Sequence, residues 1–235
     1  MSIVRSVADS PGGLALGAIL GALLGPATAA TSVTVPDHVW PWQRDSTRWL
    51  LGRPASPRRR VLMTGCGAVV LSGLAASIDW RPALAAFLFL GVLGLILAAI
   101  DLEHRRLPDR LTLTGTLGCA VVLLVDAMQT GSWASLLRGL LCAAVAVTAF
   151  FVMALISPSG MGFGDVKLAA LLSLNTGWLG WELAVLAGLA GFAAGALASL
   201  LLVLTGRARM RTAIPFGPAM LIGAWLVVVA SGPLR

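Results

Sequence analysis

Eight long, mostly apolar stretches dominate the sequence. A membrane-spanning helix needs about 20 such residues, and in lipid its backbone groups must be satisfied within the segment itself. These runs therefore predict helices, because the strands of a membrane barrel are shorter and alternate polar with apolar residues. The stretches are residues 12–30, 61–78, 82–100, 111–128, 133–156, 165–178, 183–205 and 213–230.

The composition supports the same class of protein. Hydrophobic residues make up 58% of the 235 residues and charged residues only 11%, whereas a soluble domain carries about 25% charged residues. This excludes a water-soluble globular enzyme and a disordered chain. We expect an all-α polytopic transmembrane bundle of about eight helices, with the lipid bilayer as its surroundings.

The basic residues predict the orientation of the bundle. Thirteen of the 17 lie in the loops at 31–60, 101–110, 157–167 and 206–212, all on one side of the membrane. The positive-inside rule makes that side cytoplasmic and places both termini outside. The net charge of +7 then reflects membrane topology, and we expect no nucleic-acid partner.

Two regions are expected along the chain. Residues 1–60 form an N-terminal helix and a cytoplasmic loop rich in Arg, Pro and Trp, and residues 61–235 form the main membrane domain. Arg5 and the run at 27–29 (Ala-Thr-Ala) are similar to a cleaved signal peptide. Cleavage would leave six arginines outside, so we favour a retained helix. No internal repeat is evident. Cys66, Cys119 and Cys142 have no C-x-x-C spacing, which predicts neither a disulfide framework nor a metal site.

Ten acidic residues need an explanation in so apolar a chain. Six are expected to be solvated charges in loops or at the outer ends of helices: Asp9, Asp37, Asp45, Asp79, Asp126 and Glu182. The other four lie at the predicted cytoplasmic boundary: Asp101, Glu103, Asp109 and Asp165. A charged group beside an apolar helix is costly unless it serves a site, although a single carboxylate could simply end its helix in the headgroup water.

Three glycines precede Asp165. Gly160, Gly162 and Gly164 permit positive φ and close backbone approach, so the loop can fold tightly against neighbouring helices and aim the next side chain inward. The spacing matches neither G-x-G-x-x-G nor G-x-x-x-x-G-K-[ST], which argues against a phosphate site.

Three segments together resemble a known family. Residues 160–168 (Gly-Met-Gly-Phe-Gly-Asp-Val-Lys-Leu) resemble the GxGD motif of the bacterial type IV prepilin peptidases. Residues 100–112, with Asp101 followed by Leu-Pro-Asp-Arg-Leu-Thr, resemble their first-aspartate motif, and residues 214–218 (Ile-Pro-Phe-Gly-Pro) resemble a third segment. The resemblance covers about residues 61–230.

The resemblance implies an intramembrane aspartyl protease of the bacterial inner membrane, with Asp101 and Asp165 as the catalytic pair. The residues that support the motifs would be Gly160, Gly162, Gly164, Lys167, Pro108 and Asp109. No metal or other cofactor is implied. The substrates would be prepilin-like proteins with a basic leader and an apolar helix, cut at the cytoplasmic membrane face. Larger members carry two C-x-x-C pairs in a loop and also N-methylate the product, but residues 31–60 contain no cysteine.

Other functions stay open from the sequence alone. Paired carboxylates also serve ion- or proton-coupled transporters, although there they lie near the bilayer midplane. A non-catalytic pilus-assembly protein and a GxGD protease of the presenilin or signal peptide peptidase type are further alternatives.

Individual roles can also be predicted. Asp165 would begin a helix and be the ionised base, and Asp101 would end one and be the acid, because the helix dipole favours negative charge at the N-terminus. Asp109 would be an N-cap, Lys167 would snorkel to the interface, and Glu103 and His104 would be solvated. The third and sixth helices would pack side by side at their cytoplasmic ends.

Overall fold

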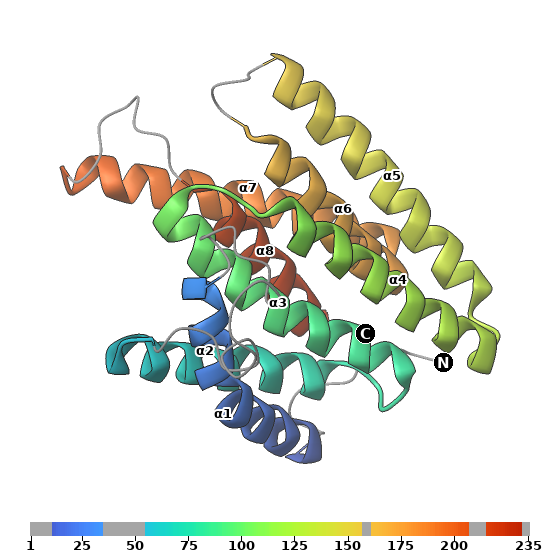
Figure 1. Cartoon of the computed structure of the whole chain (residues 1–235). Coiled ribbons are helices and arrows are strands. Elements are labelled where there is room, and N and C mark those ends of the chain that lie inside the picture. The colour runs from blue at the N-terminus through green and yellow to red at the C-terminus, as the bar shows by residue number, and fades with distance from the viewer. Residues whose placement is uncertain (1–10, 35–54, 157–160, 207–214, 232–235) are drawn as a thin grey trace.

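A computed structural model describes residues 11–34, 55–156, 161–206 and 215–231. Within these ranges every element is an α-helix, as the apolar stretches predict (Figure 1). The helices are α1 (Pro11–Thr34), α2 (Pro57–Ser77), α3 (Pro82–His104), α4 (Asp109–Thr130), α5 (Trp133–Ile156), α6 (Phe163–Leu179), α7 (Trp181–Leu204) and α8 (Gly217–Ala230).

Six of these helices, namely α1 to α5 and α7, are long and apolar enough to cross a membrane. This confirms a polytopic helical membrane protein. The two shorter helices, α6 and α8, have 17 and 14 residues. The helix boundaries differ from the expected ones at two places close to Asp101 and Asp165. Helix α3 continues past residue 100 to His104, and α6 begins at Phe163.

The first two helices form a closely packed hairpin that the sequence analysis did not foresee. Glycines recur every fourth residue along α1 and face the backbone of α2: Gly13, Gly17, Gly21 and Gly25. A Cβ added at Gly17 would lie 2.3 Å from the backbone of Ser72, closer than real atoms approach. Small residues at four-residue spacing allow membrane helices to pack backbone to backbone, so this repeat determines how α1 joins the fold.

Helices α3 and α6 lie in the interior of the bundle, each surrounded by others. Helix α3 contacts α1, α2, α4 and α8, and α6 contacts α4, α5, α7 and α8. Within the described part of the chain, α3 and α6 are not an extensively contacting pair, and their side-by-side packing at the cytoplasmic ends stays a prediction. Helices α4 and α8 contact both, and thereby connect them.

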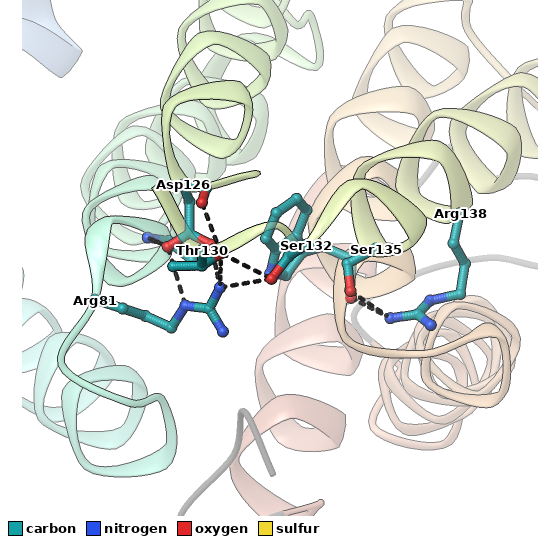
Figure 2. A network of polar contacts seen from close by, with 8 residues as sticks. Arg81, Asp126, Thr130, Ser132, Ser135 and Arg138 are labelled. Atoms are coloured by element: carbon teal, nitrogen blue, oxygen red, sulfur yellow. Dashed lines mark hydrogen bonds and ion pairs between the residues drawn. The ribbon is translucent and has the colours of Figure 1, made fainter. Parts of the chain in front are cut away.

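A buried ion pair closes one end of the bundle. Asp126 of α4 has no exposed surface, and the Nε of Arg81 donates a hydrogen bond to its Oδ1 at 3.0 Å. The Arg81 Nη2 also donates to the hydroxyls of Thr130 and Ser132, at 2.7 and 2.9 Å (Figure 2). The prediction that Asp126 is a solvated charge is therefore wrong. Arg81 precedes α3, so this network joins the start of α3 to the end of α4.

A second arginine stabilises the C-terminal end of α6, at the same end of the bundle as Arg81. The Nε of Arg138, on α5, donates to the carbonyl oxygen of Gly177 at 2.7 Å, and its Nη2 donates to the carbonyl of Trp178. The Nη2 also donates to Ser135, at 3.2 Å (Figure 2). The last carbonyls of a helix lack intrahelical partners, and a cation there also interacts favourably with the helix dipole. Arginines therefore anchor one end of both α3 and α6.

Candidate active site

Asp101 lies in the last turn of α3, at the end remote from Arg81. Asp101 is 5% exposed, and its Oδ2 accepts a hydrogen bond from the backbone N–H of Gly217 at 3.1 Å. Gly217 is the first residue of α8, where backbone N–H groups have no intrahelical partner. The carboxyl of Asp101 is therefore held by the start of a different helix.

Arg105 caps the C-terminus of α3, four residues after Asp101. It adopts the left-handed conformation with φ 51° and ψ 38°, and its N–H donates to the carbonyl oxygen of Asp101 at 2.8 Å. Helices commonly end in this way, although glycine is the usual residue. The reversal directs the following residues back across the ends of the neighbouring helices.

Asp165 is the third residue of α6. It bonds reciprocally with Gly162, the residue that caps the helix. The N–H of Asp165 donates to the carbonyl of Gly162 at 3.0 Å, and the N–H of Gly162 donates to Oδ2 of Asp165 at 3.0 Å. This is half of a capping box: the Asp165 carboxylate satisfies the N–H of the capping residue, and because glycine has no side chain the return bond goes to its backbone carbonyl. The first turn of α6 thus fixes one oxygen of the carboxyl.

Asp101 and Asp165 are held at the same end of the bundle, because Leu107 packs against both helix starts that bond their carboxyls, at Gly217 of α8 and at Gly164 of α6. Each has its Oδ2 held by one backbone N–H, and within the described residues no hydrogen bond holds either Oδ1. Both carboxyls also lie at the N-terminus of a helix, Asp101 at α8 and Asp165 at α6. Asp101 ends α3 and Asp165 begins α6, as expected, but the start of α8 also faces Asp101. This weakens the contrast in helix ends that assigned Asp165 as base and Asp101 as acid, and the assignment stays a prediction.

Leu107 packs between the two helix starts that hold the carboxyls. A Cβ on Gly164 would lie 2.8 Å from the Leu107 Cβ, and one on Gly217 would lie 3.5 Å from its Cδ1. Gly164 therefore serves close approach, as expected. Gly162 has φ −86° and open space around it, so positive φ is not the reason for glycine there. Gly160 lies outside the described residues.

Gly217 is the residue whose role sequence reasoning missed. The segment 214–218 was singled out, but nothing local indicates that its fourth residue faces Asp101. A Cβ on Gly217 would lie 2.8 Å from Asp101 Oδ2. A glycine between two prolines, just before a short apolar run, was the available sequence cue.

Asp109 and Lys167 form an ion pair that neither prediction anticipated. Pro108, and not Asp109, occupies the N-cap position of α4, and no side chain caps that helix start. Asp109 lies in the first turn, where its Oδ1 is 2.7 Å from Nζ of Lys167. Both side chains are exposed. The N-cap role for Asp109 is wrong, the snorkelling of Lys167 stays a prediction, and the pair connects α4 with α6.

The described residues contain no group of three or more His, Cys, Asp or Glu side chains that could hold a metal ion. The chemistry that the site offers is that of two carboxyl groups. A pair at short range can share one proton, so that one member accepts a proton while the other donates one.

Comparison with known proteins gives a consistent result. Residues 88–204 match the model of the type IV leader peptidase family. A prepilin leader peptidase/N-methyltransferase of Pseudomonas putida is 34% identical over 141 residues, which is 57% of this chain and 46% of the relative. The protein of that name from Pseudomonas aeruginosa is 30% identical over 73% of this chain and 58% of its own length.

A further relative is matched over more of its length. The prepilin leader peptidase/N-methyltransferase of Aeromonas hydrophila is 30% identical over 211 residues, which is 87% of this chain and 68% of the relative. The chain spans about half the length of the two Pseudomonas relatives. No solved structure matches it significantly.

Proposed function

Because this chain belongs to the type IV leader peptidase family, we propose that it is an intramembrane aspartyl endopeptidase with Asp101 and Asp165 as its catalytic pair. Its substrates are type IV prepilin-like proteins with a basic leader and an apolar helix, cut at the cytoplasmic face of a bacterial inner membrane. The observation that supports the proposal is that Leu107 packs against both helix starts that hold these carboxyls, at Gly164 of α6 and at Gly217 of α8.

Peptide hydrolysis by this pair requires one ionised and one protonated carboxyl. The ionised member takes a proton from a bound water, and the water oxygen attacks the scissile carbonyl carbon. The protonated member donates its proton to the carbonyl oxygen. When the tetrahedral intermediate collapses, the C–N bond breaks, the leaving amine takes up the proton that the base removed from water, and a hydroxyl of the intermediate returns its proton to the other carboxyl. The fixed Oδ2 atoms orient the two carboxyls, and each Oδ1 is available to water or substrate.

The position of the carboxyls separates this proposal from a transporter. Asp101 is in the last turn of α3 and Asp165 in the first turn of α6. Transporter carboxylates tend to lie near the bilayer midplane at broken helices, whereas these lie at helix ends.

The proposal covers the peptidase activity alone. The cysteines are Cys66, Cys119 and Cys142, all within helices, so the loop at 31–60 offers no zinc-binding pairs for the N-methylating form.

The test uses a Pseudomonas aeruginosa strain that lacks its own prepilin leader peptidase and expresses its prepilin. The wild-type chain should shorten the prepilin on a gel, as should the P. aeruginosa enzyme used as positive control. Asp101→Asn and Asp165→Asn keep the shape of each side chain but remove its acid–base function, so both should abolish cleavage while the protein accumulates in the membrane. Glu182→Gln is the matched control, because Glu182 is an exposed acid at the opposite end of the bundle.

Normal cleavage by Asp101→Asn or Asp165→Asn would contradict the catalytic assignment. In that case the transporter function would account better for the pair. Cleavage by neither the variants nor the wild type, with the positive control active, would contradict the substrate class.

A further inference from the structure

Arg59, in the first turn of α2, connects three helices at the end of the bundle that holds the carboxyls. Its Nε and Nη2 donate hydrogen bonds to the Ser32 Oγ at 3.1 and 2.9 Å, and its Nη1 donates to Oε1 of Glu103. Ser32 is buried near the end of α1, and Glu103 lies in the last turn of α3. One guanidinium therefore joins the ends of α1, α2 and α3.

This contact differs from an ordinary surface ion pair. The side chain of Arg59 is only 17% exposed, whereas Glu103 is 48% exposed. The planar guanidinium presents its donors in a fixed fork, so two acceptors held at once define its orientation. The expectation that Glu103 is simply solvated is wrong, because its carboxylate is engaged by this arginine.

The contact lies next to the candidate catalytic turn. Glu103 follows Asp101 by two residues, and α3 ends at His104. Terminal turns of helices fray easily, yet this turn carries Asp101. On one side it is bonded to Gly217 through Asp101 itself. Arg59 bonds it on the side of the α1–α2 hairpin, through Glu103.

We propose that Arg59 is a positioning residue for leader cleavage. Arg59 bonds both Glu103 and Ser32, and so holds the last turn of α3 against the α1–α2 hairpin. This keeps Asp101 in its position and orientation relative to Asp165. Ser32 and Arg59 lie outside the residues 88–204 that match the family model. The proposal therefore gives the α1–α2 hairpin a role in the peptidase activity. The inference rests on the proposed function.

The test measures kcat and KM of the full-length protein in liposomes, with purified prepilin of P. aeruginosa as the probe. A small misplacement of a catalytic group can cost about 10²-fold in rate. Arg59→Ala should therefore lower kcat by about 10- to 100-fold with little change in KM. Arg60→Ala is the matched control, because Arg60 is an exposed neighbour with the same charge, and it should leave kcat unchanged.

A charge exchange separates positioning from general stability. Glu103→Arg alone should lower kcat as Arg59→Ala does, and the double variant R59E/E103R should recover most of it because the ion pair re-forms. Arg59→Lys keeps the charge but loses the fork, so an intermediate kcat is expected.

Wild-type kcat in Arg59→Ala, or a double variant no better than its parents, would overturn the inference. If Arg59→Ala does not accumulate, Arg59→Lys and Glu103→Gln provide the same comparison, and wild-type kcat in both would overturn it. A wild-type protein that cleaves no prepilin contradicts the proposed function instead, so the two failures are distinguishable.

Discussion

The backbone N–H of Gly217 donates a hydrogen bond to Oδ2 of Asp101 across 116 residues of sequence. The bond joins the start of α8 to the end of α3. Because α8 has only 14 residues, its start need not lie at the level where a full-length spanning helix begins. The short helix thus presents an N–H without an intrahelical partner to a buried carboxyl, where α8 contacts both α3 and α6.

Replacing Gly217 by Ala should disturb this carboxyl directly. The new Cβ would lie 2.8 Å from Oδ2 of Asp101, so the carboxyl must shift. We expect cleavage to fall by about tenfold or more, with the protein retained in the membrane. The gel assay of prepilin shortening measures this loss. Gly188→Ala is the control, because nothing lies within 4 Å of a Cβ there, and equal cleavage by both variants would contradict the role of Gly217.

Removing Asp126 should destabilise the fold without affecting the carboxyl pair directly. Asp126→Ala leaves Arg81 partly buried and unpaired, and breaking a buried ion pair in this way costs about 3–5 kcal/mol. Replacing both residues by Leu should cost less, because no charge is left without its partner. A double variant less stable than Asp126→Ala would contradict this explanation.

The cysteines provide the measurement. Cys119 and Cys142 are buried, and Cys66 is exposed. In a Cys66→Ser background, a thiol-reactive dye should report unfolding on heating, because the two buried thiols become accessible only as the bundle opens. Asp126→Ala should lower the apparent Tm in this assay.

The glycine repeat of α1 makes a similar prediction for the hairpin. Gly17→Ala places a Cβ 2.3 Å from the backbone of Ser72, and overpacking of this kind costs about 1–3 kcal/mol. Gly12→Ala meets nothing closer than 3.9 Å, on Trp80, and is the control on the same helix. The Tm from the thiol assay should fall for Gly17→Ala alone. Equal Tm values would mean that the two helices can separate without cost.

The ion pair between Asp109 and Lys167 should matter little. Both side chains are exposed, and exposed pairs contribute about 0–1 kcal/mol and are screened by salt. We expect Asp109→Asn to leave cleavage nearly unchanged and the Tm within a degree or two of the wild type. A loss of cleavage as large as that of Asp101→Asn would assign Asp109 to the reaction itself.

The sequence was a good guide to the helices because lipid leaves an apolar segment few alternatives. The described part of each long apolar run is helical, and the two aspartates that family resemblance indicated lie at the end of α3 and the start of α6. The boundary error at α3 was small in length but important, since the four extra residues place Asp101 and Glu103 on a helical turn.

The partners of the charged residues could not be predicted in the same way. Whether Asp126 is solvated or buried depends on Arg81, 45 residues away, and the state of Glu103 depends on Arg59, 44 residues away. Local hydropathy carries no information about such pairs. The four-residue glycine spacing of α1 was visible, but composition alone does not say which helix it faces.

The two ends of the bundle differ in how strongly their contacts hold the helices. At the end remote from Asp101 and Asp165, Arg81 bonds a buried carboxylate and Arg138 bonds helix carbonyls. At the carboxyl end the contacts are backbone to carboxyl, glycine to Leu107, the bonds of Arg59 to Ser32 and to the half-exposed Glu103, and an exposed ion pair. Local opening takes the least free energy where fewest buried contacts must break. Amide hydrogen exchange along α3 and α6 should therefore quicken toward Asp101 and Asp165, so that the bundle loosens first at the proposed catalytic site.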